Sequence, residues 1–327
     1  MTTNIAIIGS HSFSGNSYTS HTTKRESCLA VSRSHRLFAQ FDAGLYGKFS
    51  DQKIVWNVNE DSSEVIKAIQ SSKVKTVVNF AAQSMVGQSW NSPEDWYQAN
   101  VVSLAMFANR LRNETDVEKF VHFTTPEVYG STEGWIKESF NFAPNTPYAI
   151  SRAAGDWHLR ALYENCNFPV IFTRAANVYG EHQQLYRIVP RVILSALTGE
   201  KLPLQGGGKS IRSFIHTSDV NTALDRVVTS GKIGETYHIS TNVVITIHDL
   251  VQKIASKMNV NFDNLVEVTP DRPGKDLAYQ LDSEKIRTEL GWSDEINLDQ
   301  GLDRTITWVK QNLDELRNVP TEYIHRK

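Results

Sequence analysis

Short apolar runs alternate with helix-like segments along the first half of the chain. The apolar runs are continuous, which is typical of strands buried on both faces of a sheet. Alternation of such strands with helices predicts an α/β fold, with a doubly wound parallel sheet covered by helices on both sides. The predicted strands are Ile5–Ile8, Cys28–Val31, Ile54–Val58, Thr76–Phe80, Phe120–Thr124 and Val170–Arg174, and the predicted helices include Ser63–Gln70, Pro93–Arg112 and Tyr148–Tyr163.

The pattern loosens after about residue 175, where Pro190, Pro203 and Gly206–Gly208 divide the chain into shorter elements. We therefore expect a main domain over residues 1–175 and a smaller C-terminal lobe over residues 176–327. Segments from about 210–240 are expected to return to the main sheet. Because doubly wound sheets bind ligands outside the carboxyl ends of their strands, the second lobe is expected to face a substrate there.

Composition narrows the possible partners of the 327-residue chain. Its 34 basic and 36 acidic residues leave a formal charge of −2, so no strong field favours nucleic acid or an anionic membrane. No run of about 18 apolar residues predicts a membrane span. The first apolar run begins too close to Met1 for a signal peptide, and the two cysteines fit a reducing cytoplasm. No histidine or cysteine spacing predicts a metal site.

A glycine-containing loop follows the first predicted strand. Gly9 and Gly15 let the backbone turn tightly and approach a pyrophosphate at the N-terminus of the next helix. Residues 1–175 would then form a dinucleotide-binding domain of Rossmann type. An ordinary strand–helix turn is the alternative, although a position after the very first strand favours the dinucleotide. The expected contacts are Gly9, Ser12, Phe13, Ser14 and Gly15.

The end of the second predicted strand bears on the choice of dinucleotide. An acidic residue there would bind the adenosine ribose hydroxyls of NAD, but the chain has Ser32 and Arg33. A guanidinium matches phosphate geometry, so the pair could hold a 2′-phosphate, which slightly favours NADP over NAD. A solvated surface loop is the alternative. After the fourth strand, the small residues Ala81 and Ala82 let the backbone pass close to the cofactor.

Four residues suggest acid–base chemistry on an alcohol. Tyr148 and Arg152 lie four apart after Pro147, a good helix-starting residue, so they share one helix face. A cation one turn away favours the phenolate and would let the tyrosine act as a base. At the end of the fifth strand, Thr125 could hydrogen-bond a substrate hydroxyl, and Glu127 could remove a C–H proton beside a new ketone. Ordinary surface residues are the alternative at each position.

With these motifs the chain resembles the extended short-chain dehydrogenase/reductase family of nucleotide-sugar enzymes. Within it, the sequence is most similar to the 4,6-dehydratases that act on dTDP-glucose or GDP-mannose, over about residues 4 to 310. Three departures fall inside family motifs. Ser12 replaces the middle glycine of G-x-x-G-x-x-G, Pro126 replaces Asp or Ser between Thr125 and Glu127, and Arg152 replaces the lysine of Tyr-x-x-x-Lys.

The resemblance implies further roles. Arg152 is expected to bind the nicotinamide ribose, although its planar fork is not an ammonium point donor. Pro126 removes a candidate acid. Asp219 is expected to order the lobe rather than to touch substrate. Asn57 and Val58 are expected against adenine, and the expected substrate contacts are Gln83, Ser84, Asn177, Arg187, Leu204, Arg212 and Arg272, of which the three arginines suit a diphosphate.

These observations favour an NDP-hexose 4,6-dehydratase that oxidises C4, removes the C5 proton and expels water from C6. Epimerisation, or decarboxylation of an NDP-uronate, is an alternative on the same scaffold, although Glu127 argues mildly against an epimerase. A non-catalytic nucleotide-sugar or NADP-binding protein is a second alternative, which Ser12, Pro126 and Arg152 keep open. By resemblance, the helices near Pro93–Arg112 and Tyr148–Tyr163 imply a homodimer.

Overall fold

The computed structural model describes residues 4–34, 52–271, 274 and 276–326. Its centre is a seven-stranded sheet in which every neighbouring pair is parallel. The predicted α/β fold is thus confirmed, and the strand order reverses between β1 and β4, where such sheets bind ligands. In spatial order the strands are β12 (Thr236–Ile239), β7 (Val170–Ala175), β5 (Lys119–Thr124), β4 (Thr76–Asn79), β1 (Ile5–Ile8), β2 (Cys28–Ser32) and β3 (Gln52–Val55).

Alternate side chains of β1 pack into the two hydrophobic layers on either side of the sheet. Ile5 and Ile7 face α1 (Phe13–Thr23), α8 (Thr217–Ser230) and α11 (Glu284–Leu290). Ala6 and Ile8 face α3 (Ser63–Ser71), α5 (Leu104–Glu114) and α6 (Pro147–Cys166). Because both faces are covered, the strand sequences are continuously apolar, as the pattern predicts.

Two predicted elements differ in detail from the structure. The third strand spans Gln52–Val55 rather than Ile54–Val58, because the ladder ends when Trp56 N donates to Ser32 O and Asn57 then accepts from Asn59 N to start a turn. The predicted helix Pro93–Arg112 contains a π turn, η2 (Gln98–Ser103), between α4 (Pro93–Tyr97) and α5. This turn carries Asn100, whose side chain bonds the Gln83 backbone and the Ser151 hydroxyl.

The second lobe has its own hydrophobic cluster. It is built by α7 (Ile188–Thr198), α9 (Ile247–Lys257), α12 (Leu298–Gln311) and α13 (Leu313–Leu316), beside the parallel pair β9 (Leu202–Gln205) and β14 (Val266–Thr269). Shorter pairs join β8 (Asn177–Tyr179) to β11 (Phe214–His216), β10 (Ile211–Arg212) to β13 (Ile245–Thr246), and β6 (Trp135–Ile136) to β15 (Gln280–Leu281). The remaining short helices are η1 (Gly87–Trp90), η3 (Pro126–Tyr129), η4 (Gly206–Gly208) and α10 (Phe262–Leu265).

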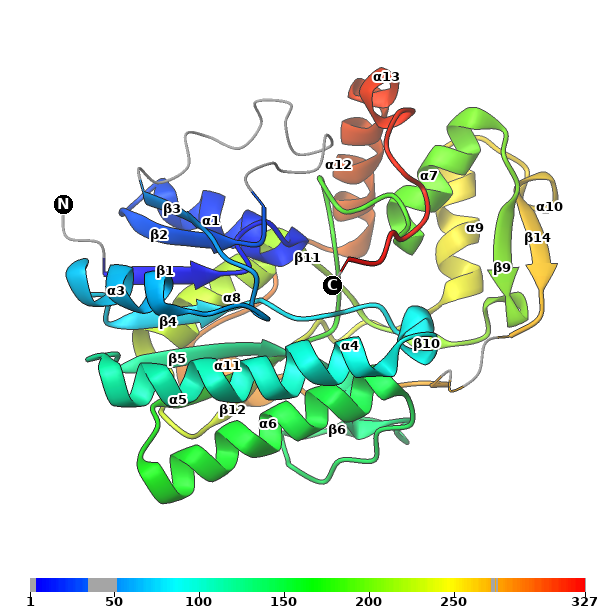
Figure 1. Cartoon of the computed structure of the whole chain (residues 1–327). Helices are drawn as coiled ribbons and strands as arrows, with labels where there is room; N and C mark the ends of the chain where they lie inside the picture. Colours follow the sequence, from blue (N-terminus) through cyan, green and yellow to red (C-terminus); the bar gives the residue numbers. More distant parts are fainter. Residues whose placement is uncertain (1–3, 35–51, 272–273, 275, 327) are drawn as a thin grey trace.

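The C-terminal segment does not end in this lobe. Beyond α13 it runs back between the lobe and the sheet, so that the end of the chain lies near the middle of the molecule (Figure 1). Among the helices of the described residues, none combines the length and apolar character needed to cross a membrane.

Candidate active site

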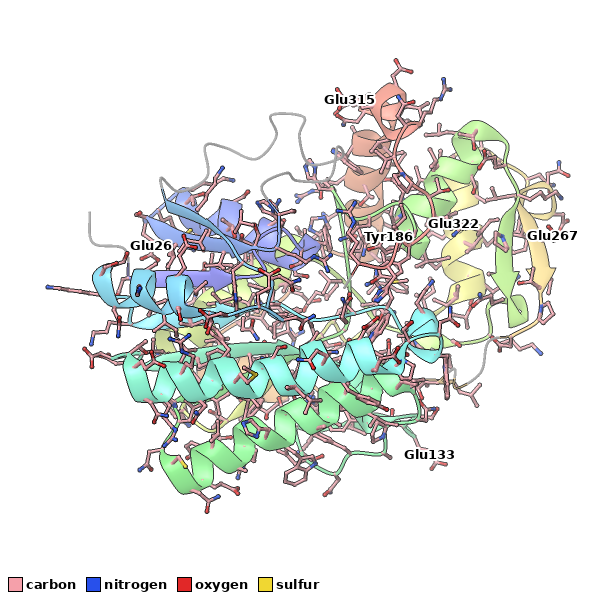
Figure 2. All side chains as sticks on the ribbon, in the orientation of Figure 1. Glu26, Glu133, Tyr186, Glu267, Glu315 and Glu322 are labelled. Carbon is pink, nitrogen blue, oxygen red and sulfur yellow. The ribbon has the colours of Figure 1, made fainter. Side chains whose placement is uncertain are left out.

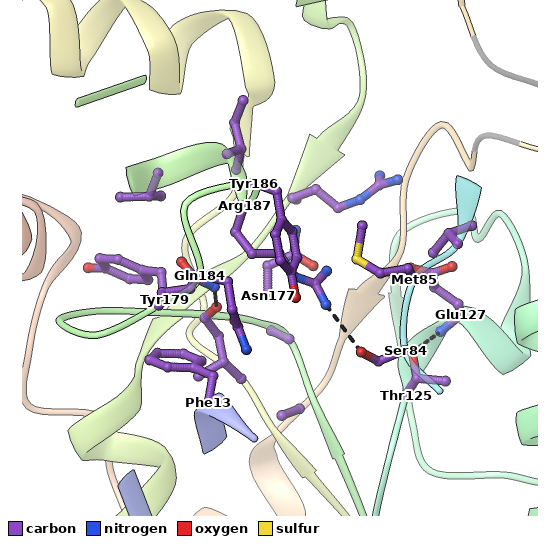
Figure 3. Close-up of a pocket in the computed structure, with 18 of the residues that line it drawn as sticks. Phe13, Ser84, Met85, Thr125, Glu127, Asn177, Tyr179, Gln184, Tyr186 and Arg187 are labelled. Atoms are coloured by element: carbon purple, nitrogen blue, oxygen red, sulfur yellow. Dashed lines mark hydrogen bonds between the residues drawn. The ribbon is translucent and has the colours of Figure 1, made fainter. Parts of the chain in front are cut away.

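A cavity of about 630 Å³ lies at the carboxyl ends of the central strands, between the sheet and the second lobe. Figure 3 shows Ser84, Thr125 and Glu127 on one side of it, and Asn177, Tyr179 and Arg187 on the other. The structure thus brings most predicted site residues to one space. Those that line it are Ser12, Phe13, Ser14, Ala82, Ser84, Thr125, Glu127, Tyr148, Arg152, Asn177, Arg187, Leu204 and Arg212.

The loop after β1 has the geometry of a pyrophosphate cradle. Gly9 has a φ of +79°, and a Cβ there would lie 2.7 Å from Ala81 N, so only glycine allows this approach. A Cβ on Gly15 would overlap the Gly9 carbonyl oxygen. Ser12, in place of a third glycine, caps α1: its Oγ donates to Gly9 O and accepts from Gly15 N. The N-terminus of α1 therefore reaches the cavity in a form that fits a dinucleotide diphosphate.

The predicted adenosine contacts gather at the neighbouring strand ends. The Ser32 hydroxyl donates to Ser34 O, and Arg33 Nη1 donates to Arg326 O at 2.8 Å. Val58 and Ala81 line a second cavity of only about 10 Å³. Val58 and Ala81 thus share one small cavity, whose described lining does not include Ser32 or Arg33.

Tyr148 and Arg152 lie on the first turns of α6. Thr146 caps this helix by accepting from Ala149 N, and both Tyr148 and Arg152 are buried. Burial raises the pKa of Tyr148 above its ordinary value, while Arg152, the Thr125 hydroxyl and Arg187 lower that pKa and Glu127 raises it further. Arg152 therefore acts on the tyrosine in the expected direction, but desolvation outweighs the nearby cation, so the pKa of Tyr148 stays raised.

Further buried ionisable groups, which were not predicted from the sequence, lie next to Tyr148 and Arg152. Asp156, one turn beyond Arg152, accepts from Arg174 at 3.0 Å and from Thr124 at 3.2 Å, and all of these groups are buried. Burial and the two arginines hold the pKa of His122 well below its usual range, so this histidine is neutral. Of the two buried arginines, Arg152 is the one that lowers the pKa of Tyr148 and so favours its phenolate. The four-residue spacing of Tyr148, Arg152 and Asp156 is the signal that could have revealed Asp156 as their neighbour.

Pro126 fits the local backbone. Thr125 begins η3 and its Oγ1 accepts from Glu127 N at 3.2 Å, while Pro126 takes the first helical position, where no N–H is needed. The strand end therefore still presents Thr125 and Glu127 to the cavity, without an acid between them.

The second lobe contributes the basic wall. Arg187 Nη2 reaches Ser84 Oγ at 3.4 Å from the opposite side of the cavity (Figure 3). Arg212 stacks over Tyr279 at 4.2 Å and donates to the carbonyls of Ile211, Asp276 and Leu277. The Asn177 amide oxygen accepts from Tyr279 OH. Arg191, one turn after Arg187, also lines the cavity, and this spacing is a signal that the sequence analysis missed.

Two of the predicted substrate contacts, Gln83 and Arg272, are not among the described residues that line the cavity. The amide of Gln83 instead bonds Tyr323 OH and Arg326 O of the C-terminal segment. Arg272 lies outside the described residues. Asp219 has the predicted structural role, since its carboxylate accepts from the backbone of Glu295 and Ile296. Among the described residues there is no cluster of three or more histidine, cysteine or carboxylate side chains that could hold a metal.

Comparisons with known proteins find similarity to nucleotide-sugar 4,6-dehydratases in both sequence and structure. The chain is 32% identical to a dTDP-glucose 4,6-dehydratase of Xanthomonas campestris pv. campestris over 270 residues, which cover 77% of each protein. It is 34% identical to the human dTDP-D-glucose 4,6-dehydratase, over 79% of this chain and 75% of that protein. The structure of DesIV, a dTDP-glucose 4,6-dehydratase from Streptomyces venezuelae with NAD bound, superposes with a TM-score of 0.86 at 27% identity. That superposition covers 95% of this chain and 98% of DesIV.

The family model described as GDP-mannose 4,6 dehydratase matches residues 16–305, which is most of the chain. The match, the relatives and the fold confirm the resemblance to the nucleotide-sugar dehydratases of the extended short-chain dehydrogenase/reductase family. The chain belongs to the GDP-mannose 4,6 dehydratase family.

Proposed function

We propose that this chain is an NDP-hexose 4,6-dehydratase whose reaction takes place in the 630 Å³ cavity. The observation that carries the proposal is the meeting of Thr125, Tyr148 and Glu127 in one cavity with a basic far wall. The first two suit oxidation of an alcohol, and the third suits removal of a proton beside the resulting ketone. Kinship with 4,6-dehydratases over most of the chain supports the same reaction.

The cofactor in this proposal is a nicotinamide dinucleotide with its diphosphate at the N-terminus of α1. The close approach at Gly9 and Gly15 fits that group. When bound, it would accept a hydride from C4 and return one to C6. Arg33, with no acid at the end of β2, favours NADP, and identification of the dinucleotide released on denaturation tests this choice. Recovery of NAD alone, with no effect of Arg33→Ala on its retention, would overturn it.

Oxidation begins at the C4 hydroxyl of the sugar. In our proposal the Thr125 hydroxyl holds this group and the Tyr148 phenolate takes its proton. The positive charges of Arg152 and Arg187 stabilise that phenolate against the desolvation that opposes it. Tyr148, Arg152 and Thr125 are therefore assigned to the first half-reaction.

Elimination follows at C5 and C6. The new C4 ketone acidifies the C5 proton, Glu127 removes it, and the C6 oxygen leaves as water after accepting a proton. Pro126 cannot donate that proton, so Glu127 passes on the one that it has taken. When hydride is returned to C6, C5 takes up a proton that derives from solvent. A separate general acid contributes about 10² to 10⁴ in rate, so we expect a slow dehydratase.

The diphosphate of the substrate is assigned to Arg187, Arg212 and Arg272, with Asn177 and Leu204 as further contacts. Arg187 and Arg212 both line the cavity, and both come from the residue range 176–327. Guanidinium groups bind phosphate oxygens in a bidentate manner, which suits a group with two negative charges. The residue range 176–327 thus serves mainly to bind the nucleotide sugar.

Assembly and location are also part of the proposal. Tyr97, Val102, Met106, Ile150 and Trp157 are large apolar side chains that remain exposed on the run from α4 to α5 and on α6. These helices lie side by side in Figure 1, and we propose that they form a homodimer interface. Neither Cys28 nor Cys166 forms a disulfide bond, which suits the reducing cytoplasm.

Absorbance of the bound cofactor distinguishes an enzyme from a non-catalytic sensor. Purified protein mixed with dTDP-, GDP- and UDP-hexoses should show transient growth of the reduced-nicotinamide absorbance with one of them. Binding of a nucleotide sugar without any such signal and without a new product would favour the sensor.

A further inference from the structure

The C-terminal segment, residues 317–326, connects the second lobe to the dinucleotide-binding side. On the lobe, Arg191 Nη1 donates to Thr321 O at 3.3 Å, and the rings of Tyr186 and Tyr323 meet at 5.5 Å. Figure 2 shows Tyr186 close to Glu322 in the same place. Tyr186 and Arg191 both line the active-site cavity, so the segment lies at the edge of that cavity.

Its last residues contact α4, the start of α6 and the loop after β4. His325 stacks on Trp96 at 4.9 Å and pairs with Asp95 at 2.8 Å. Tyr323 packs against the cluster of Val86, Trp96 and Tyr148 and donates to Gln83 Oε1. These contacts anchor the segment on α4 and on the loop after β4.

The carbonyl oxygen of Arg326 links this segment to two residues that were expected to lie beside the cofactor or the substrate. Arg326 O accepts from Arg33 Nη1 at 2.8 Å and from Gln83 Nε2 at 2.7 Å. Arg33 follows β2 and Gln83 follows β4, the two strands on either side of β1. The segment therefore bridges the strand ends between which a dinucleotide crosses a doubly wound sheet.

Over the part of the chain that the structure describes, the large cavity reaches only the nicotinamide end of the expected dinucleotide path. The large cavity includes the N-terminus of α1 and Tyr148, but its described lining includes no residue of β2 or of the loops after β2 and β3. At the expected adenine position the second cavity has about 10 Å³, room for about one water molecule. Among the described residues, Arg326 does not line this small cavity, but its carbonyl oxygen occupies the Arg33 guanidinium at the end of β2, the position expected to meet the adenosine side of the dinucleotide.

We propose that residues 321–326 form an autoinhibitory strap, which occupies the adenosine side of the groove and must detach before the dinucleotide binds. The inference rests on the proposed dinucleotide site. A phosphate would displace the neutral Arg326 carbonyl from Arg33, because hydrogen bonds between charged partners are the stronger ones. While the strap is docked, the apparent affinity falls by the fraction of molecules that are open.

Removal of residues 321–327 tests the proposal directly. The cut keeps Leu316 and Val319, which pack in the hydrophobic core of the lobe. After bound nucleotide is stripped from the protein, we expect the Kd for NADP and for NAD to fall about tenfold, the effect of a strap docked in about nine molecules of ten. An unchanged or higher Kd would overturn the proposal.

Two point variants guard against effects of truncation itself. His325→Ala removes the ion pair with Asp95 and the stack on Trp96, and should tighten dinucleotide binding in the same direction. Ile324→Ser is the matched control in the strap, since Ile324 is 58% exposed, and should leave the Kd unchanged. Equal effects of the two variants would contradict the proposal.

Hydrogen exchange gives a readout that is independent of catalysis. Addition of NADP to the full chain should speed exchange in peptides covering residues 318–326, because the strap leaves its site. Slower exchange there would show a lid that closes over the cofactor and would overturn autoinhibition. Neither experiment uses a sugar substrate, so failure of the dehydratase assignment would appear in the product assay while the strap result stands.

Discussion

Arg152 places a guanidinium where the family motif Tyr-x-x-x-Lys calls for an ammonium, one helical turn from Tyr148 and buried with it. Its Nη2 donates to the Phe123 carbonyl, which fixes the group at the end of β5. Arginine stays charged in a buried site where lysine loses its proton more readily. Burial already raises the Tyr148 pKa, so a permanent cation is what the phenolate requires here.

Replacement of Arg152 tests that requirement. Arg152→Ala should slow reduction of the bound cofactor by about 10²-fold or more, the usual loss for one preorganised electrostatic contact. Arg152→Lys should keep substantial activity, because it keeps the charge. Arg160→Ala is the control, since Arg160 lies on the same helix and pairs with the partly exposed Glu164. Near wild-type turnover of Arg152→Ala on the true substrate would show that the assignment is wrong.

The carboxylate of Glu127 sets the pH dependence of the first half-reaction. Glu127 raises the Tyr148 pKa, so Glu127→Gln should lower that pKa and move the ascending limb of the rate of cofactor reduction to lower pH. The measurement is single-turnover absorbance over a pH series. Glu133→Gln, in an exposed loop, should leave the profile in place. A profile displaced to higher pH, or not displaced, would contradict the proposed effect of Glu127 on the pKa of Tyr148.

At the scale of elements, the turn from β1 into α1 depends on two glycines rather than three. A Cβ on Gly9 or Gly15 would overlap backbone atoms nearby, and Ser12 caps the helix with its own hydroxyl. This is why the departure from the family motif at Ser12 leaves the turn intact. A serine cap satisfies the same helix end that binds a diphosphate.

Gly15→Ala should therefore damage both stability and cofactor retention. Its methyl group would overlap Gly9 O, and we expect a loss of about 1–3 kcal/mol in the free energy of unfolding, as for other overpacked sites. Urea unfolding and the dinucleotide content of purified protein measure the two effects. Gly199→Ala meets open space at a φ of +76°, so it isolates backbone strain from overlap. Full cofactor content in Gly15→Ala would count against the cradle.

The strands could be predicted because each buries both faces, and a buried strand leaves a continuous apolar run. The third strand was displaced by two residues because its end is decided by the Asn57 turn, which the apolar pattern does not encode. The π turn at Gln98–Ser103 was missed for a similar reason. It depends on Asn100 bonding Gln83 and Ser151, which are distant in sequence.

At the scale of the molecule, contacts between distant segments were the hardest to predict. Thr125, Glu127, Tyr148 and Arg152 follow strand ends or share a helix face, so local rules bring them together. Gln83 and Arg33 were expected to contact ligands, yet both bond Arg326, which lies 243 and 293 positions away. Nothing in the local pattern around either residue indicates that partner.

The proposed dimer depends on the exposed apolar face formed by α5 and its neighbouring helices. Met106→Lys puts a charge on the exposed apolar face of α5, where Met106 is 63% exposed, and should convert a dimer to monomers in light scattering. Val268→Lys is the control, because Val268 is equally exposed but lies on β14 of the second lobe. A wild-type monomer, or a dimer that survives Met106→Lys, would rule out this interface.

The most direct test of the account is the product formed in D₂O from the NDP-hexose that reduces the bound cofactor. Dehydration predicts a 4-keto-6-deoxy sugar nucleotide, lighter by one water before the label is counted and carrying deuterium at C5. Glu127→Gln should still allow partial reduction of the cofactor but release no such product. A wild-type product of unchanged mass would instead mean an epimerase, and loss of carbon dioxide from an NDP-uronate would mean a decarboxylase.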